Sequence, residues 1–489
     1  MKYILSIDQG TTSSRAILFD KNGQKIEMAQ REVKCLFPNS GWVEADATAI
    51  WISVMDVINE VLIKANLTID DIDSIGLTNQ RETTVVWSKK TGMPVYNAIV
   101  WQSRQSADIC EALSDQKELI HQKTGLLINP YFSASKVRFI LDHIENGQKL
   151  AEAGELLFGT IDSWLIYKMT MGQSHMTDVT NASRTLLYNI NEMKWDEELC
   201  RLFNIPMKML PKVCPSAHDF GQVSFLKSDV HITGVLGDQQ AALFGQTCFE
   251  SGESKNTYGT GCFLLVNTGD KPVLSKNGLL TTVAWQIGKD VTYALEGSVF
   301  IGGAVVQWLR DEMKLIHHSS DSERVALEAP SGEIYIVPAF TGLGTPYWDD
   351  DARGAVFGLT RGTNKHHFIR ACLDGIAYQC KDVFVTMTSE LGTCLKCLKV
   401  DGGATANKYL MQFQSDILQC EIKLPSCLET TALGAAYLAG LNSGYFSSIE
   451  EIKSIHCYQA TYEPKMSNKE SDKIYEGWKK AVEAARFFK

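Results

Sequence analysis

The sequence has few of the features that would mark a membrane, secreted or nucleic-acid-binding protein. No stretch approaches the roughly 18 unbroken apolar residues of a membrane span, and only five residues, Tyr3–Ile7, separate the initial lysine from an aspartate. That run is too short for the apolar region of a signal peptide. Lysine and arginine form no basic tract of the kind that binds nucleic acid. We therefore expect a cytoplasmic protein with no membrane span and no nucleic-acid partner.

Disulfide and common nucleotide-binding signatures are missing as well. The thirteen cysteines are odd in number and show no framework of spacings. The CLKC segment, Cys394–Cys397, is a lone CxxC with no histidine at zinc spacing, so we interpret the cysteines as reduced, mostly buried thiols. Neither GxxxxGK[ST] nor GxGxxG occurs. P-loop and dinucleotide-binding folds therefore lose their usual support.

The size and charge of the chain set broad limits on its organisation. Its 489 residues exceed the length at which single hydrophobic cores stop growing, about 250–300 residues, so we expect at least two domains. With 45% hydrophobic and 21% charged residues, the composition is that of a globular protein. The net charge is −10. An anionic substrate would therefore need local cations or a metal ion to approach.

The same order of strand, Gly/Thr turn and strand begins each half of the chain. Tyr3–Ile7 predicts a strand, residues 10–14 a hydroxyl-rich turn, and Ala16–Phe19 a second strand. Near the middle, a strand leads into the turn at 259–261, and Cys262–Val266 predicts the strand that follows. This recurrence indicates two related domains that face each other.

Helical patterns lie between the predicted strands. Apolar residues follow helical spacing after Asp46, with Asp46 or Thr48 as the cap, and another helix is expected around residues 104–113. Interleaved strands and helices favour α/β domains with mixed sheets. We expect the domains to span residues 1–250 and 251–489, joined by a short, hinge-like connection.

Two aspartates each follow an apolar strand. Asp8 stands beside the turn DQGTTSSR, where a carboxylate suits a water-coordinated magnesium ion but could equally cap the turn. Asp238 lies between the strand end VLG and the helix start QQAALFG. It is either an N-cap or a general base at the carboxyl end of a strand, where α/β sheets bind ligands. These residues alone leave both alternatives open.

A pair of opposite charges interrupts an apolar segment. In IGLTNQRETTVVW, Arg81 and Glu82 stand side by side between two strand-like runs. Removing such ions from water costs several kcal/mol each unless something satisfies them. The pair is either a structural ion pair or is satisfied by a bound ligand, and the residues alone leave this open.

The chain resembles the FGGY carbohydrate kinases from Lys2 to nearly its end. Its NQRET segment is similar to that of the members that phosphorylate glycerol. The resemblance is carried by SIDQGTTSSRAILFD, GWVEAD, YNAIVWQSR, TNASRT, GDQQAALFGQ, NTYGTGCF, ALEGSVFIGGAVVQWLRDEMKLI, VPAFTGLGTPYWD and VDGGATAN. It implies the actin-like ATPase fold: two ribonuclease-H-like domains, mixed β-sheets flanked by helices, and a cleft between the domains.

The resemblance also implies an activity, ATP-dependent phosphorylation of glycerol to sn-glycerol 3-phosphate. Transfer is expected to be direct and in line, with Asp238 as general base and Mg²⁺ near Asp8 and Asp238. The residues implied at the glycerol site are Arg81, Glu82, Trp101, Tyr131, Asp238, Gln239 and Phe263. The aromatic ones would otherwise be core residues. The residues implied at the ATP site are Thr11, Thr12, Ser13, Arg15, Thr260, Gly303, Gln307, Gly403 and Asn407.

Two alternative functions stay open: a kinase of another small polyol or ketose in the same family, and an actin-like ATPase module that is not a kinase. Some members bind a sugar bisphosphate through a Gly-Gly-x-Arg loop, which GQVSFLKSDVHITG lacks. Neither His218 nor His231 matches the phosphorylatable histidine of other members. Because the family commonly forms dimers or tetramers, we expect a homodimer or homotetramer.

Overall fold

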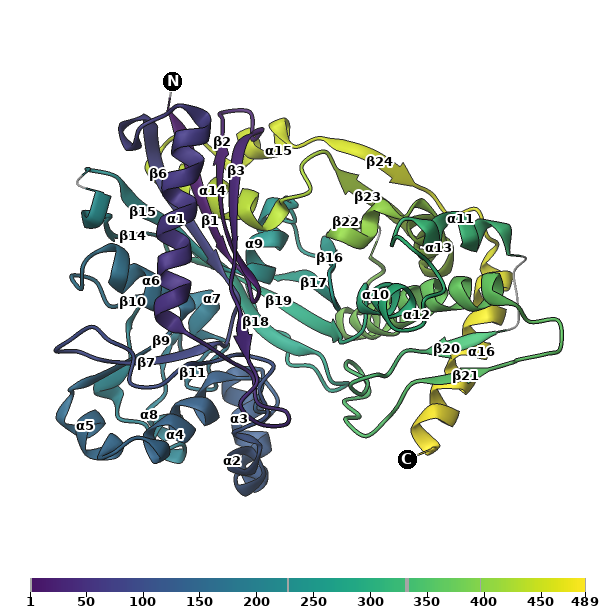
Figure 1. The fold of residues 1–489 in the computed structure, drawn as a ribbon, viewed down its shortest axis with the longest axis horizontal. Helices are drawn as coiled ribbons and strands as arrows, with labels where there is room; N and C mark the ends of the chain where they lie inside the picture. The colour runs from purple at the N-terminus through teal and green to yellow at the C-terminus, as the bar shows by residue number, and fades with distance from the viewer. Residues whose placement is uncertain (1, 227, 330–333, 396, 489) are drawn as a thin grey trace.

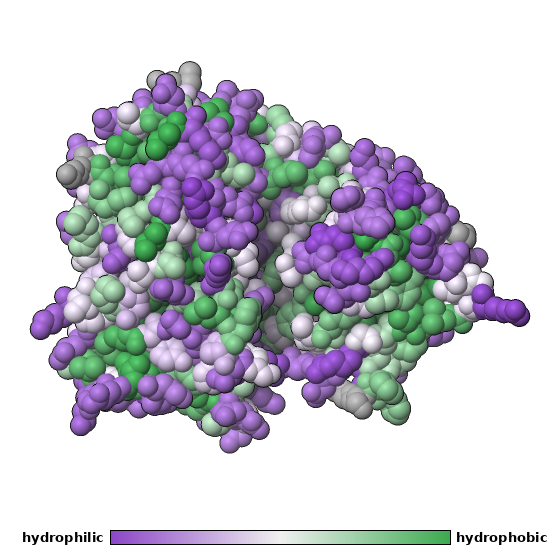
Figure 2. All heavy atoms as spheres, in the orientation of Figure 1, coloured by the Kyte–Doolittle hydropathy of each residue, from purple (hydrophilic) through white to green (hydrophobic). Residues whose placement is uncertain are grey.

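The computed structural model describes residues 2–226, 228–329, 334–395 and 397–488, which form two lobes separated by a groove (Figures 1 and 2). Within these residues a 13-stranded mixed sheet runs through both lobes in the order β24-β23-β22-β16-β17-β19-β18-β14-β15-β6-β1-β2-β3. Its strands are β1 Tyr3–Gln9, β2 Ser13–Phe19, β3 Lys25–Glu32, β6 Ile72–Asn79, β14 Ala217–Gln222, β15 His231–Gly237, β16 Ser254–Tyr258, β17 Cys262–Gly269, β18 Leu280–Ile287, β19 Asp290–Val299, β22 Cys397–Asp401, β23 Glu421–Pro425 and β24 Tyr458–Tyr462.

Smaller sheets and helices complete the two lobes. A five-stranded sheet consists of β4 Cys35–Leu36, β5 Glu44–Ala45, β7 Thr84–Ser88, β8 Ala98–Ile99 and β9 Leu156–Thr160. The strand pairs are β10 Met176–Asp178 with β13 Lys212–Cys214, β11 Tyr188–Asn189 with β12 Lys194–Trp195, and β20 Tyr335–Val337 with β21 Ala355–Phe357. The helices are α1 Ala47–Ala65, α2 Ala107–Ala112, α3 Lys117–Thr124, α4 Ser133–His143, α5 Gly147–Ala153, α6 Ile161–Met169, α7 Val179–Ala182, α8 Glu197–Leu202, α9 Asp238–Gly245, α10 Ala304–Asp311, α11 Asp321–Glu328, α12 Lys365–Leu391, α13 Lys408–Leu418, α14 Thr430–Ser443, α15 Ile449–Ile455 and α16 Asn468–Phe487.

Most local expectations from the sequence are confirmed. The first two strands form as an antiparallel pair, β1 with β2. Helix α1 begins after Asp46, whose carboxylate accepts hydrogen bonds from the main-chain N–H groups of Thr48 and Ala49 at 2.7 and 3.2 Å. The helix expected at 104–113 is shorter: α2 spans Ala107–Ala112, residues 105 and 106 form a turn before it, and the N–H of Arg104 bonds to the carbonyl of Gly41 at 2.9 Å. Among the described residues, every helix is too short or too polar to cross a membrane.

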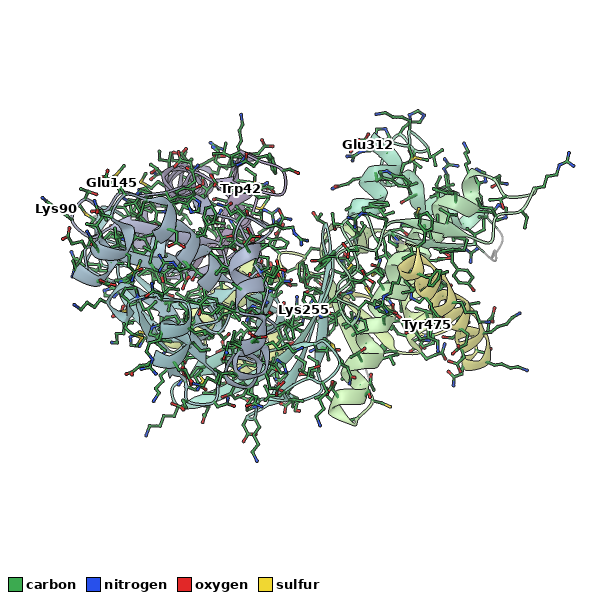
Figure 3. All side chains as sticks on the ribbon, turned by 90° about the horizontal axis from the view of Figure 1, so that it is seen from below. Trp42, Lys90, Glu145, Lys255, Glu312 and Tyr475 are labelled. Carbon is green, nitrogen blue, oxygen red and sulfur yellow. The ribbon has the colours of Figure 1, made fainter. Side chains whose placement is uncertain are left out.

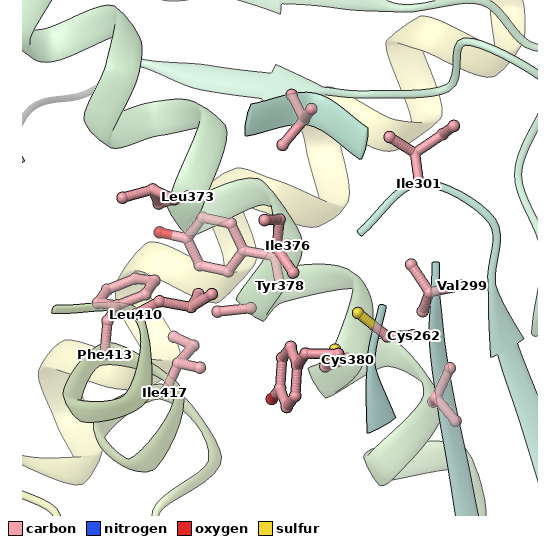
Figure 4. Close-up of a cluster of buried hydrophobic side chains, with 14 of the residues drawn as sticks. Cys262, Val299, Ile301, Leu373, Ile376, Tyr378, Cys380, Leu410, Phe413 and Ile417 are labelled. Carbon is pink, nitrogen blue, oxygen red and sulfur yellow. The ribbon is translucent and has the colours of Figure 1, made fainter. Parts of the chain in front are cut away.

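The core of the C-terminal lobe lies between its strands and the long helix α12. Figure 4 shows Cys262 and Val299, from β17 and β19, on the side of α12 that carries Cys380, whereas Tyr378 of α12 lies on the opposite side. Helix α13 adds Phe413 from the other side. This packing fixes the sheet from which the second Gly/Thr turn projects.

Helix α14 belongs to the second half of the chain but packs on the N-terminal lobe. It packs on β1, β6 and β15 and crosses α9 (Figure 1). At the crossing the two backbones touch: a Cβ on Gly434 would lie 1.8 Å from the carbonyl oxygen of Ala241, and one on Gly245 would lie 2.0 Å from that of Thr430. The predicted division between residues 250 and 251 stays a prediction, and α14 packs on the first lobe although it lies beyond that point.

The α9–α14 crossing gives a stability prediction. Gly434→Ala should lower the free energy of unfolding by about 2–3 kcal/mol or more, since a methyl group pressed against backbone cannot be relieved by a side-chain rotation. Urea unfolding followed by circular dichroism measures the change. Gly362→Ala is the control, because a Cβ there would approach only the Thr360 hydroxyl at 3.8 Å. Equal stability of the Gly434 variant and the wild type would contradict the described crossing.

Candidate functional site

The site begins where three neighbouring strands end. β6 runs parallel to both β1 and β15, and the register pairs Gln9 and Gly237 with the same residue, Asn79. The segments at these strand ends therefore share one edge of the sheet: Asp8 near the end of β1, the turn 80–83 after β6, and Asp238 after β15. This is the edge at which open α/β sheets bind ligands.

The turn after β6 buries both of its charges. The side chains of Arg81 and Glu82 are each 2% exposed. Glu82 has a φ of 61°, a left-handed conformation that is unfavourable for a residue with a Cβ. The turn is stabilised because the carbonyl oxygen of Glu82 accepts hydrogen bonds from the hydroxyls of Thr84 and Ser133, both at 3.0 Å. Backbone strain of this kind is typical of functional sites.

Two residues that the sequence analysis did not predict hold this pair. Glu296 accepts two bonds from Arg81, at 2.5 Å from Nη1 and 3.0 Å from Nη2. Arg184 donates to Glu82 at 2.6 Å and to Glu296 at 3.0 Å. Arg81 Nε also lies 3.2 Å from Asp238 Oδ1. The contacts of the described residues leave one N–H of Arg81 Nη2 and one oxygen of Glu82 available to a ligand.

Burial and charge compete at each carboxylate of the site. Burial raises the pKa of Glu82, against the lowering effects of Arg184 and Arg81. Burial likewise raises the pKa of Asp238, and Arg81 opposes it most strongly. At Glu296 the two arginines outweigh burial and hold its pKa at about 2. This network therefore contains at least one carboxylate that stays ionised at neutral pH.

Asp238 is not the N-cap of α9. The cap is Gly237, and Asp238 is the first residue of the helix, where its carboxylate contacts Arg81 and the N–H of Gln239 at 2.7 Å. Its side chain remains 29% exposed. The capping interpretation that the sequence left open is therefore wrong. The carboxylate of Asp238 instead contacts the guanidinium group of Arg81.

The predicted aromatic residues lie together beside the charged pair. The ring centroids of Trp101 and Tyr131 are 5.4 Å apart, and those of Trp101 and Phe263 are 6.4 Å apart. All three side chains are half-buried, so they form a wall with exposed surface. Trp101 Nε1 donates to the hydroxyl of Thr11 at 2.9 Å, which connects this wall to the first Gly/Thr turn.

Lys255 is a third residue that the sequence analysis missed. It lies on β16 with no exposed surface, and its ammonium group donates to Gln239 Oε1 at 2.5 Å, Thr257 Oγ1 at 2.9 Å and the carbonyl of Phe263 at 3.2 Å. Burial lowers its pKa to about 8. A single charge within otherwise uncharged residues, as in KNTYGTG, TNASRT and ALEGSVF, is the signal that could have identified these three residues.

The predicted phosphate-binding residues form two groups, one in each lobe. Thr11 and Thr12 lie in the β1–β2 turn and Ser13 begins β2. Arg15 follows on β2, where its Nη1 lies 3.2 Å from Glu429 Oε2. In the other lobe, the N–H of Gly303 bonds to the carbonyl of Gly259 at 2.8 Å, beside Thr260.

The other predicted nucleotide-site residues adjoin the second group. A Cβ on Gly303 would lie 3.9 Å from the Cβ of Ala404, which brings Gly303 near Gly403. Gln307 lies on α10. Asn407 caps α13 by accepting from the N–H of Leu410 at 2.9 Å.

Asp8 and Asp238 form a pair suited to a hydrated cation. Burial raises the pKa of Asp8 to about 7; Arg15 opposes this, and the negative charge of Asp238 adds to it. No group of three or more His, Cys, Asp or Glu side chains suited to a metal occurs in the part of the chain that the structure describes. Magnesium commonly keeps several waters and uses only one or two carboxylates together with substrate phosphates. The residues therefore fit a water-rich magnesium site rather than a cage of protein ligands.

Comparisons with known proteins agree over the whole chain. Residues 3–245 match the N-terminal domain of the FGGY family of carbohydrate kinases, and residues 254–443 match its C-terminal domain. Glycerol kinases of Geobacillus sp. (strain WCH70) and Bacillus licheniformis are 58% and 56% identical to the chain over 494 aligned residues, each alignment covering 100% of both proteins.

Solved structures show the same likeness. A crystal structure of Plasmodium falciparum glycerol kinase with ADP has a TM-score of 0.93 and 38% identity, covering 99% of this chain and 98% of the other. A ligand-bound xylulose kinase from Lactobacillus acidophilus, at a TM-score of 0.88 and 23% identity over 99% of this chain and 98% of its own, shares the fold. The expected two-domain, actin-like ATPase fold is thereby confirmed.

Proposed function

Because the chain belongs to the FGGY family of carbohydrate kinases, we propose that it phosphorylates glycerol with ATP at the groove between its lobes, yielding sn-glycerol 3-phosphate. Relatives that are 56–58% identical over the full length are glycerol kinases. The alternatives, a kinase of another polyol or ketose and a non-kinase ATPase module, are not favoured. The single observation that carries the site assignment is the buried Arg81–Glu82 pair, held by Arg184 and Glu296 beside Asp238.

The charged pair and the aromatic wall suit a small polyol. The free oxygen of Glu82 accepts a hydrogen bond from one hydroxyl, and the free N–H of Arg81 donates to its neighbour, both as charge-assisted bonds. Trp101, Tyr131 and Phe263 cover the carbon chain. Gln239 and Asp238 contact the remaining hydroxyl.

Asp238 acts as the general base. An alcohol is a weak nucleophile at neutral pH, so its proton must leave as the new O–P bond forms. Arg81, 3.2 Å from the Asp238 carboxylate, favours the ionised form that can accept this proton. The hydroxyl oxygen attacks the terminal phosphorus in line with the departing ADP oxygen, and no covalent enzyme intermediate forms.

The nucleotide is bound by both lobes. Thr11, Thr12, Ser13 and Arg15 contact the terminal phosphates from one side, and Thr260 does so from the other. Toward the ribose and adenine the contacts are Gly303, Gln307, Gly403 and Asn407. Asp8 and Asp238 would hold Mg²⁺ through water, and the ion would offset phosphate charge.

The lobes divide these tasks in this proposal. Residues 1–250 supply most of the contacts to glycerol and the transferred phosphate, to which Phe263 and Thr260 add from the other side, and residues 251–489 bind the ribose and adenine of the nucleotide. We propose further that the enzyme works in the cytoplasm as a homodimer or homotetramer.

An assay of ATP consumption with and without glycerol tests the proposed function. We expect turnover that depends on glycerol and yields glycerol 3-phosphate in equal amount to ADP. A panel of C3 to C5 polyols and ketoses gives the control for substrate class. Slow ATP hydrolysis indifferent to glycerol would instead identify an ATPase module, and preferential turnover of a ketose would identify a different kinase of the family.

A further inference from the structure

Lys255 lies at the junction of the two lobes, against two residues of the proposed glycerol site. Figure 3 shows it between the two halves of the molecule. Its partner Gln239 belongs to α9, and its partner Phe263 belongs to β17. With Thr257, these residues supply three acceptors for the three N–H groups of the ammonium.

The ammonium determines which way the amide of Gln239 points. A protonated lysine has no acceptor, so the amide must turn its oxygen toward Lys255, whichever way its two similar ends are assigned. Gln239 is only 8% exposed, which limits other arrangements of the side chain. Its Nε2 group has no hydrogen-bond partner among the described residues, although Oε1 and the main-chain N–H are both bonded. The group of Gln239 that remains available to a ligand is therefore Nε2, which is a hydrogen-bond donor.

The neighbouring lysine, Lys399, makes contacts that indicate a purely structural role, and it serves as a comparison for Lys255. Lys399 is the register partner of Lys255 on β22 and is 7% exposed. Its ammonium contacts Glu253 Oε1 and the carbonyl of Thr247, both at 3.0 Å, and neither is a proposed substrate contact. Lys255 differs because its shortest bond is to a residue of the proposed glycerol site.

We propose that Lys255 is a positioning residue that fixes Gln239 as a hydrogen-bond donor, and that it thereby sets the preference for a polyol bearing all three hydroxyls over the corresponding diols. This inference rests on the proposed function, since Gln239 meets glycerol only there. A site whose buried polar group needs a substrate hydroxyl rejects the analogue that lacks it, because the protein group is then left unpaired. Without Lys255 the amide can rotate, and this discrimination weakens.

The first test replaces the amide. The preference is measured as kcat/KM for glycerol divided by kcat/KM for 1,2-propanediol and, separately, for 1,3-propanediol. Gln239→Leu and Gln239→Glu should both lower the preference over one of the two diols by about 10- to 100-fold. Glutamate keeps the bond to Lys255 but has no NH₂ group. A Gln239→Glu enzyme with wild-type preference would show that this residue accepts rather than donates, and would overturn the inference.

The second test asks whether Lys255 acts through Gln239. Lys255→Met should lower the same preference about 10-fold, whereas Lys255→Arg, which still offers only donors, should retain it. In a Gln239→Leu background Lys255→Met should change the preference no further. Lys399→Met is the matched control and should keep the preference.

The possible failures are distinguishable. An equal loss from Lys255→Met with and without Gln239 would overturn the inference. If Lys255→Met does not fold, the Gln239→Glu comparison decides. A wild-type enzyme that phosphorylates neither glycerol nor the diols would contradict the proposed function instead.

Discussion

Replacing Asp238 with asparagine should lower kcat for glycerol about 10²- to 10⁴-fold, the usual cost of losing a general base. Asparagine has nearly the same shape but cannot take the proton of the attacking hydroxyl. Binding of glycerol should survive in part, because Arg81 keeps its two bonds to Glu296. Steady-state kinetics give kcat, and calorimetric titration gives glycerol affinity.

A matched control separates this effect from a general effect at a helix start. Asp108 also lies in the first turn of its helix, α2, but it is exposed and outside the site. Asp108→Asn should keep wild-type turnover. Near-normal turnover in the Asp238 variant would remove this residue as the base.

Arg81→Ala should raise the KM for glycerol by about 10- to 100-fold, since each hydrogen bond to a charged group contributes roughly 1.5–3 kcal/mol. The change also leaves Glu296 with only Arg184 as an arginine partner, so we expect a loss of about 3–5 kcal/mol in unfolding free energy. Arg81→Lys keeps a charge but cannot bind Glu296 through a bidentate fork, and should fall between wild type and alanine in glycerol KM.

The measurement compares glycerol and ATP kinetics in each variant, with urea unfolding to confirm folding. Arg104→Ala is the control, since Arg104 is 57% exposed and contacts Asp350 at 3.1 Å outside the proposed site. Its glycerol KM should stay at the wild-type value. An unchanged glycerol KM in the folded Arg81 variant would contradict the proposed role of the buried pair.

Local features of the fold were predictable because their causes are local. Asp46 caps α1 through N–H groups two and three residues ahead, so the signal and its effect lie together in the sequence. The partners of Arg81 do not: Glu296 is 215 residues away, and Arg184 is 102 residues from Glu82. A lone charge in an apolar segment indicates that a partner must exist. It does not indicate which one.

Helix starts show the same limit. A glycine followed by an aspartate suits either a cap at the aspartate or a cap at the glycine, and only the fold shows that Gly237 has that role. The return of α14 to the first lobe was also beyond local reasoning. Its contact depends on Gly434 meeting the backbone of α9, which belongs to a segment almost 200 residues earlier in the numbering.

The left-handed backbone of Glu82 has an evolutionary consequence. Glycine would adopt a φ of 61° with less strain, and asparagine is the next best replacement. A mutation to either residue would therefore relieve the backbone strain at Glu82, but it would also remove the carboxylate. Lineages adapting to heat through this position would lose the proposed contact between Glu82 and the alcohol, so we expect gains in thermal stability to arise elsewhere in the molecule.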